Sequence, residues 1–115
     1  MLVVDDSPLV TEALGVLLEA VGYRAAAAGS VAEAVAAVRE APPAAVLLDV
    51  TLPDGDGMDV LARLGPGAPP TLALTGHDDP ETAARCLTAG CRAVLVKPVR
   101  TADLLRALAE AGVAA

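Results

Sequence analysis

Short runs of Val, Leu and Ala alternate along the chain with longer segments in which apolar residues recur every three or four positions. Continuous apolar runs predict buried strands, and helical spacing predicts amphipathic helices. Five strands are predicted, over residues 2–5, 23–27, 45–49, 71–75 and 93–96. Five helices are predicted, from the Ser7-Pro8 pair to Gly22, from Ser30 to before Pro42, from after Gly57 to Leu64, from Asp79 to Gly90, and from Thr101 to about Ala111.

Local signals mark several of these boundaries. Ser30 followed by Glu33 is typical of a capping box. Asp79 stands before a proline and is predicted to cap the fourth helix, as Thr101 is predicted to cap the fifth. The acidic, glycine-containing segment 54–57 lacks the ligand pattern and closing Glu of a calcium loop, so it is interpreted as a turn.

The alternation of strands and helices predicts an α/β fold. Because the strands are continuously apolar, we expect a parallel sheet covered on both faces rather than an antiparallel sheet with one face in water. The 115 residues suffice for one domain, and neither a linker nor an internal repeat divides them. The sequence therefore predicts one α/β domain over residues 1–115.

Composition and charge exclude several classes of function. Tyr23 is the only aromatic residue, which argues against a nucleic-acid platform that stacks bases on rings. The formal net charge of −7 disfavours general binding to phosphate backbones. No stretch of about 18 residues is free of charge, Pro and Gly, and the N-terminus has no basic leader. We therefore expect a cytoplasmic protein that contacts neither nucleic acid nor membrane.

The two cysteines and the single histidine do not indicate a metal site. They are too few for a four-ligand zinc site, so Cys86 and Cys91 are predicted to be small buried apolar residues. His77 is interpreted as an exposed loop residue.

Polar side chains gather where the predicted strands end. The first strand ends at Asp5 and Asp6, the third at Asp49, the fourth at Thr75 and the fifth at Lys97. In an open parallel sheet the carboxyl ends of the strands meet at one edge, and ligands bind there. The sequence thus predicts three carboxylates, one hydroxyl and the only lysine of the chain at that edge.

Three converging carboxylates repel one another. Two unit charges about 5 Å apart cost roughly 3 kcal/mol at an effective dielectric constant near 20. A hard divalent cation relieves this repulsion, and all-oxygen ligands suit Mg²⁺. Lys97 and Thr75 can meet an anion in the same pocket, which is typical of sites that handle phosphoryl groups. With no histidine in this set, a carboxylate is the natural nucleophile.

Four segments form one pattern when they are taken together in order. They are Val3-Val4-Asp5-Asp6-Ser7-Pro8, Leu47 to Pro53 with Asp56-Gly57, Leu74-Thr75-Gly76, and Gly90 with Lys97-Pro98. This pattern resembles the CheY-like receiver domain of two-component response regulators, and the resemblance covers nearly the whole chain. It implies a flavodoxin-like, doubly wound fold, with a five-stranded parallel sheet in the order 2-1-3-4-5 flanked by five helices.

The resemblance also implies roles for individual residues. Asp49 would be the phosphoacceptor, taking a phosphoryl group from a histidine of a sensor kinase or phosphotransfer protein. Asp5 and Asp6, with Asp49 and the backbone carbonyl of Thr51, would hold Mg²⁺. The protein would then act as a switch that catalyses only its own phosphorylation and dephosphorylation, not as an enzyme acting on other substrates.

Two further site residues follow from the same resemblance. Lys97 would pair with the phosphoryl group, and its peptide bond to Pro98 would be cis. Thr75 would bond a phosphoryl oxygen and move toward it after Asp49 is modified. The residues that tune the lifetime of the phosphoryl group in such domains are here Thr51 and His77, and neither is an obvious activator of water.

One position departs from the family pattern. Val94 stands where the family usually has Tyr or Phe, whose ring swings inward on activation. Because valine cannot report its state by a large ring movement, the departure bears on the strength and route of output and not on the phosphorylation chemistry. The simplest interpretation of four arginines of the C-terminal half is solvated surface; alternatively they line the face of helix 4, strand 5 and helix 5, which receiver domains use for dimers and partners. These arginines are Arg85, Arg92, Arg100 and Arg106.

Two other functions remain open from the sequence. A Mg²⁺-dependent phosphatase with an aspartyl nucleophile would share Asp49 and Lys97, but it normally has an acid two residues after the nucleophile, where Thr51 stands here. An interaction module that no longer uses phosphorylation is left open by Val94, but the complete set of site residues argues against it; these are Asp5, Asp6, Asp49, Thr75 and Lys97.

Overall fold

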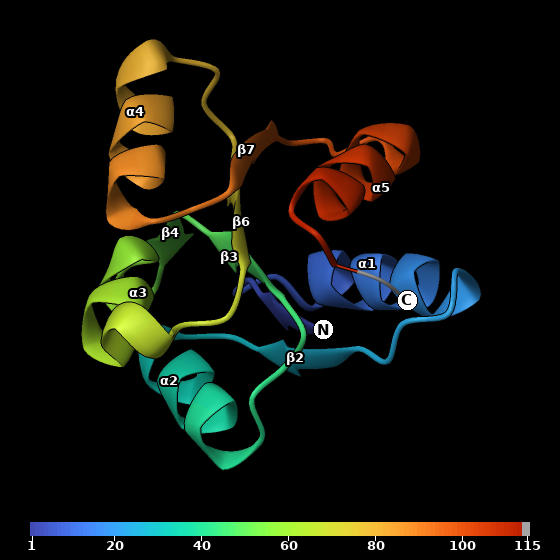
Figure 1. The fold of residues 1–115 in the computed structure, drawn as a ribbon, viewed down its shortest axis with the longest axis horizontal. Helices are drawn as coiled ribbons and strands as arrows, with labels where there is room; N and C mark the ends of the chain where they lie inside the picture. Colours follow the sequence, from blue (N-terminus) through green and yellow to red (C-terminus); the bar gives the residue numbers. More distant parts are fainter. Residues whose placement is uncertain (114–115) are drawn as a thin grey trace.

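Five parallel strands form the centre of the molecule. The computed structural model describes residues 1–113 and orders the strands β2-β1-β3-β6-β7, with every pairing parallel (Figure 1). Since β6 and β7 are the fourth and fifth strands of this sheet, the predicted order 2-1-3-4-5 is confirmed. Their bounds are Leu2–Val4 for β1, Ala26–Ala28 for β2, Val46–Asp49 for β3, Thr71–Thr75 for β6 and Ala93–Val96 for β7.

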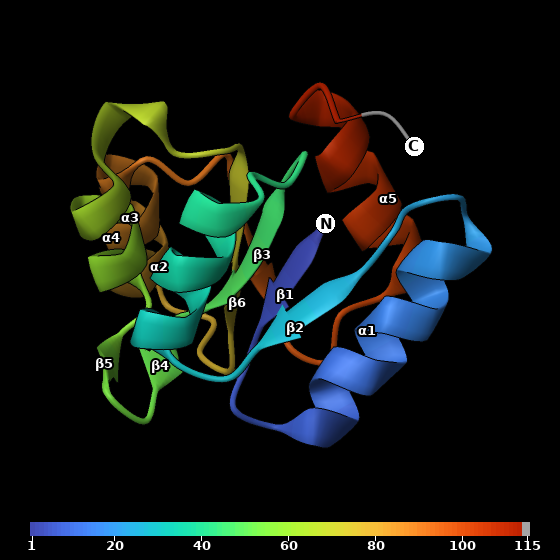
Figure 2. The ribbon, with the colours of Figure 1, turned by 90° about the horizontal axis from the view of Figure 1, so that it is seen from below.

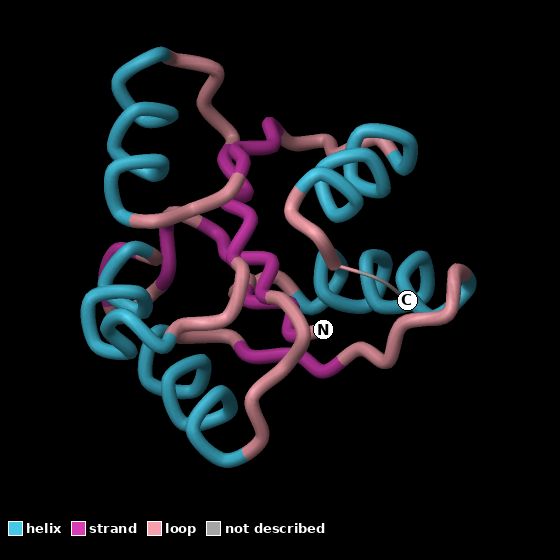
Figure 3. The backbone as a smooth tube through the Cα atoms, viewed as in Figure 1, coloured by secondary structure: helices cyan, strands magenta, loops and turns pink. Residues whose placement is uncertain are grey.

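Five helices cover the two faces of the sheet, as predicted. Figures 1 and 3 show α1 and α5 on one face and α2, α3 and α4 on the other. None of these helices is long and apolar enough to cross a membrane within residues 1–113. Their bounds are Pro8–Ala20 for α1, Val31–Glu40 for α2, Met58–Leu64 for α3, Pro80–Ala89 for α4 and Thr101–Glu110 for α5.

The core lies in two layers because successive strand residues point to opposite faces of the sheet. On β3, Leu48 packs in the layer under α2, α3 and α4, whereas Leu47 packs in the layer under α1 and α5. Both side chains are fully buried. The continuous apolar runs are therefore strands buried on both sides, as a doubly covered parallel sheet requires.

The second strand is shorter than predicted and begins later. It was expected over residues 23–27, but β2 spans only Ala26–Ala28. Tyr23 lies before it, and its hydroxyl donates a 3.1 Å hydrogen bond to the carbonyl of Val113. A run of alanines has little β preference, and this edge strand is set by its pairing with β1, where Leu2 faces Ala26.

Most helix boundaries follow the local signals. The Ser30 hydroxyl accepts from the N–H of Glu33 at 3.1 Å, and Asp79 accepts from the N–H of Thr82 at 2.9 Å, so both predicted caps are confirmed. The prediction for Thr101 is wrong. It is the first residue of α5, while Arg100 occupies the cap position with no side-chain hydrogen bond.

The segment interpreted as a turn belongs to a short antiparallel hairpin. Strands β4, Thr51–Leu52, and β5, Gly55–Asp56, pair directly after β3, and the 3₁₀ turn η1, Gly65–Gly67, follows α3. Figure 2 shows the hairpin at the edge of the sheet where α1 begins. The hairpin thus lies at the carboxyl ends of the strands, beside the predicted site.

Candidate functional site

The sheet brings the three predicted carboxylates together. Strands β1 and β3 are hydrogen-bonded neighbours with Val4 opposite Leu48, so Asp5 and Asp49 leave adjacent strand ends. Ligand oxygens of Asp5, Asp6 and Asp49 lie within 4.8 Å of one another. Asp5 and Asp49 are buried, whereas Asp6 is exposed. This set of oxygens, open to solvent on one side, fits a hard divalent cation that keeps some of its water ligands.

Lys97 follows the edge strand β7, and its side chain extends to the same carboxylates. Its Nζ lies 2.6 Å from Oδ2 of Asp5 and 3.3 Å from Oδ2 of Asp49. The N–H of Lys97 donates to the carbonyl of Thr75 at 2.7 Å, which extends the β6–β7 pairing to the strand ends. The Lys97–Pro98 bond is cis, as the resemblance implied. One ammonium group therefore faces two buried carboxylates.

The charges of this cluster are only partly balanced. Burial, with the nearby charge of Asp5, raises the pKa of Asp49 from its ordinary value, although Lys97 and the N–H of Thr51 act in the opposite direction. Burial alone would lower the pKa of Lys97, but its hydrogen bond to Asp5 and the charges of Asp49 and Asp5 outweigh burial and raise it. A bound cation would relieve the remaining excess of negative charge.

Thr75 ends β6 at the same edge, but its hydroxyl makes no hydrogen bond to the carboxylates among the described residues. The residue is buried, and its hydroxyl accepts from the N–H of His77 at 3.0 Å and lies 3.4 Å from the His77 carbonyl. Among the described residues these are the only hydrogen bonds of the hydroxyl. His77 itself is exposed, as predicted. The structure thus unites Asp5, Asp49 and Lys97, while Thr75 is bonded within its own loop.

The loop after Asp49 contains a glycine whose structural role the sequence analysis did not assign, although it named the Asp56-Gly57 pair. Thr51 donates its N–H to Oδ1 of Asp49 at 3.3 Å, and Gly57 donates its N–H to the carbonyl of Val50 at 2.7 Å. A Cβ atom built on Gly57 would lie 2.0 Å from the carbonyl oxygen of Asp49. Only glycine allows this approach, and the Asp56-Gly57 pair in the sequence was the available signal.

The remaining predicted residues lie around this centre. Val94 is half-buried and packs against the core layer under α2, α3 and α4. Cys86 and Cys91 are buried and not disulfide-bonded, as predicted, and burial raises the pKa of the Cys91 thiol to about 12. The arginines predicted as surface are exposed; they are Arg85, Arg92, Arg100 and Arg106.

Comparison with known proteins agrees with this geometry. The family model of the response regulator receiver domain matches residues 1–109. The chain belongs to this family. The receiver domain is 40% identical to the probable transcriptional regulatory protein TcrX of Mycobacterium tuberculosis over 94% of its own length. It is also 40% identical to the positive alginate biosynthesis regulatory protein of Pseudomonas aeruginosa over 96% of its length.

Solved structures agree as well. A response regulator receiver protein from Burkholderia phymatum is similar with a TM-score of 0.85 and 37% identity, covering 99% of this chain and 95% of that one. The receiver domain spans only about half the length of the curated relatives, 48% of TcrX and 46% of the alginate regulator. The similarity therefore establishes the domain, and the activities of the whole relatives are not transferred with it.

Removing the charge of Asp49 is expected to stabilise the metal-free receiver domain. Because the pKa of Asp49 is raised in the fold, the folded state binds a proton more tightly than the unfolded chain, and stability falls as the pH rises above the ordinary value of 3.8. Asp49→Asn removes this loss. In EDTA at pH 7 its thermal midpoint should exceed that of wild type, and the difference should shrink toward about pH 4.

Excess Mg²⁺ should narrow the gap between the two midpoints at pH 7 by stabilising the wild type. Asp78→Asn, at an exposed carboxylate, serves as the control and should leave the midpoint unchanged. If the thermal midpoint of D49N in EDTA were at or below that of wild type, the charge of Asp49 would not destabilise the metal-free fold, and the prediction would be wrong.

Gly57→Ala should destabilise the receiver domain because its Cβ would collide with the backbone of Asp49. The expected loss is about 2 kcal/mol or more, measured by urea unfolding. Gly67→Ala is the matched control, since a Cβ at Gly67 meets nothing within 4 Å. Equal unfolding midpoints for the two variants would show that the hairpin does not need this close approach.

Proposed function

We propose that the receiver domain accepts a phosphoryl group on Asp49 from the phosphohistidine of a sensor histidine kinase or phosphotransfer protein. A carboxylate oxygen of Asp49 attacks phosphorus, and the P–N bond to the donor histidine breaks as the P–O bond forms. The observation that carries this proposal is the convergence of Asp5, Asp49 and Lys97 at one strand edge. The chemistry is mainly positioning and neutralisation of charge.

Mg²⁺ is the proposed cofactor. Asp5, Asp6 and Asp49 with the backbone carbonyl of Thr51 would hold it, and when bound it neutralises negative charge on the carboxylates and the incoming phosphoryl oxygens. The clustering of the three carboxylates and the raised pKa of Asp49 support this choice. Lys97 supplies a second positive charge, because its ammonium already lies 3.3 Å from Oδ2 of Asp49.

Thr75 couples the modified Asp49 to the rest of the fold. Its hydroxyl, now bonded to His77, turns toward a phosphoryl oxygen and draws the loop before α4 with it. The phosphoryl group shifts the population toward this arrangement only by the contact energy that it gains there. Val94 offers no ring to swing behind Thr75, so the shift is passed on by the loop and α4.

The domain works as a cytoplasmic switch and not as an enzyme with external substrates. It catalyses only the gain and loss of its own phosphoryl group. The face formed by α4, β7 and α5 is the proposed surface for a homodimer or a partner, since β7 is the edge strand of the sheet there. An output domain or target protein reads the changed face.

Phosphorylation is tested by incubating the receiver domain with acetyl phosphate and Mg²⁺ and measuring its intact mass. We expect the mass of one phosphoryl group per chain, lost in EDTA and in Asp49→Asn but kept in Asp78→Asn. Turnover of a generic phosphate monoester would instead favour the aspartyl phosphatase. An unlabelled chain, under conditions that label a known receiver, would favour the phosphorylation-independent interaction module.

Thr75→Ala should separate chemistry from switching. The variant keeps the three carboxylates and Lys97, so beryllofluoride with Mg²⁺ should still bind at Asp49. The amide NMR signals of residues 76–79, which shift in wild type, should move at least several-fold less in the variant. Thr71→Ala, which removes a buried hydroxyl from the other end of β6, should leave these shifts unchanged. Full-size shifts in T75A would rule out the coupling role.

A further inference from the structure

The β4–β5 hairpin begins just after Asp49, and the residue that follows it, Gly57, lies against the backbone of Asp49. Thr51 faces Asp56 across the hairpin, and Gly57 closes the loop by donating its N–H to Val50 and lying against the Asp49 carbonyl. The backbone of Thr51, which the proposed function makes a metal ligand, pairs with Asp56 in the hairpin and with no strand of the five-stranded sheet, whereas the preceding residue, Val50, donates its N–H to the carbonyl of Leu74 in that sheet. The position of Thr51 depends on what holds the hairpin.

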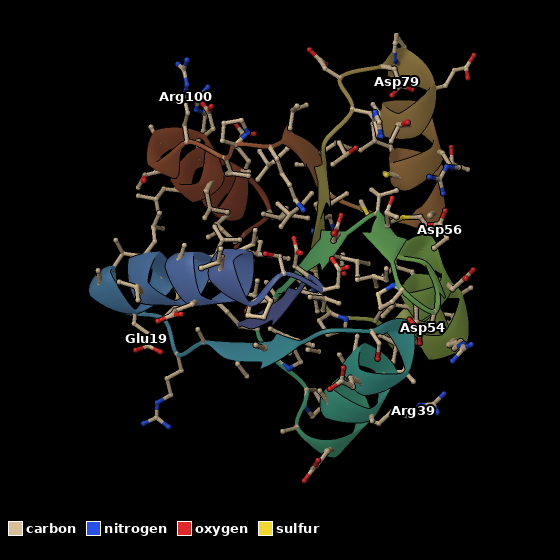
Figure 4. The ribbon with its side chains drawn as sticks, turned by 180° about the vertical axis from the view of Figure 1, so that it is seen from behind. Glu19, Arg39, Asp54, Asp56, Asp79 and Arg100 are labelled. Atoms are coloured by element: carbon tan, nitrogen blue, oxygen red, sulfur yellow. The ribbon has the colours of Figure 1, made fainter. Side chains whose placement is uncertain are left out.

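Two neighbouring helices hold the hairpin through its acidic side chains. The Asp54 carboxylate accepts from the N–H groups of Val31 at 2.7 Å and Ala32 at 3.1 Å, in the first turn of α2. On the other flank, Oδ2 of Asp56 accepts from Nη1 of Arg85 on α4 at 2.6 Å. Figure 4 labels Asp54 beside α2 and Asp56 toward α4. The hairpin is thus tied to one helix on each side.

The two ties differ in what they connect. The tie to α2 ends on backbone N–H groups of a helix that packs on the sheet. The tie to α4 ends on a single long side chain, and α4 follows the loop of Thr75 and His77 directly. Within residues 1–113, Arg85–Asp56 is the only ion pair that joins α4 to the hairpin. A displacement of α4 would therefore alter this ion pair and, with it, the position of Asp56 in the hairpin.

We propose that Arg85 is a positioning residue for the phosphorylation site, because its ion pair with Asp56 holds Thr51 in the place that Mg²⁺ binding requires. This inference rests on the proposed function. It also makes the coupling two-way, since a change in α4 alters the metal site and occupancy of the site alters α4. The pair is partly exposed, with side-chain exposures of 47% and 40%, so its effect is modest.

Plain electrostatics predicts the opposite sign from positioning. Removing the positive charge of Arg85 leaves Asp56 unpaired and makes the edge of the sheet more negative, which alone would strengthen binding of a cation. If Arg85 positions the hairpin, its loss weakens binding instead. The direction of the change therefore separates the two explanations.

The experiment compares wild type with Arg85→Gln, using Mg²⁺ titrations followed by amide NMR. We expect the dissociation constant for Mg²⁺ to rise about two- to fivefold, the range that one exposed ion pair supports. In EDTA, hydrogen exchange of the Thr51 amide should accelerate by a similar factor. Arg85→Lys keeps a positive charge that reaches Asp56. It should therefore show at most half of the increase in each readout, the dissociation constant for Mg²⁺ and the exchange rate of the Thr51 amide.

Two controls test whether the effect passes through the pair. Arg106→Gln removes the same charge from the Arg106–Asp103 pair on α5 and should change neither readout. Asp56→Asn keeps an oxygen that can accept from the N–H of Met58, and adding Arg85→Gln to it should have little further effect. Additive effects of the two substitutions would overturn the proposal, as would unchanged or tighter Mg²⁺ binding in R85Q.

The outcomes also distinguish this inference from the proposed function. If the wild-type receiver domain bound no Mg²⁺, the proposed function would fail, and the Thr51 exchange rate in EDTA would still decide the role of Arg85. Unchanged exchange in R85Q would overturn the positioning role. If wild type binds Mg²⁺ and is phosphorylated but R85Q matches it in both readouts, only the inference fails.

Discussion

Mutual repulsion among carboxylates at one edge of the sheet is the constraint on which the site depends. Asp5 and Asp49 are buried at neighbouring strand ends, and one ammonium, from Lys97, faces both. Burial raises the pKa of Asp49, so the metal-free fold carries a group that would be more stable uncharged. The site is therefore assembled at a cost in stability, which a cation or a phosphoryl group with its counter-charges can offset.

The backbone around Asp49 is held rigidly by the rest of the fold, which keeps the carboxylates close together despite their repulsion. Three of the five strands, β1, β3 and β6, are paired on both sides, and the chain folds back on Asp49 at Gly57. The hairpin is held on its two flanks, where its own Asp54 accepts from the N–H of Val31 in α2 and its Asp56 pairs with Arg85 of α4. Under the proposed function, this arrangement would let the hairpin move while Asp49 stays fixed at the end of β3.

Under the proposed function, Val94 would change the route by which the domain passes on its signal. Without an aromatic ring at this position, no large side chain is available to change places behind Thr75. What remains are the loop of residues 76–79, helix α4 and the contact from α4 to the hairpin. Because a two-state change is limited by the difference in contact energy between its states, the few polar contacts along this route carry a larger share of it.

Much of the fold was predictable from the sequence because it depends on local patterns. Continuous apolar runs predicted the five sheet strands, and capping residues such as Ser30 and Asp79 predicted the helix starts. The sequence predicted element boundaries poorly where the residues have little preference for a strand or a helix cap. The alanine-rich β2 takes its limits from β1, and Thr101 does not cap α5 because the chain enters that helix at Arg100.

The site residues themselves could be predicted from the sequence. The carboxyl ends of neighbouring parallel strands lie at one edge of the sheet, and the polar residues at those ends are visible in the sequence. The tertiary structure alone decided how these side chains meet: that Lys97 lies nearer to Asp5 than to Asp49, that Thr75 bonds within its own loop, and that the hairpin is braced by Asp54 and Arg85. Such contacts join residues about 20 or more positions apart or depend on side-chain orientation, and no local pattern of hydrophobic and polar residues encodes either.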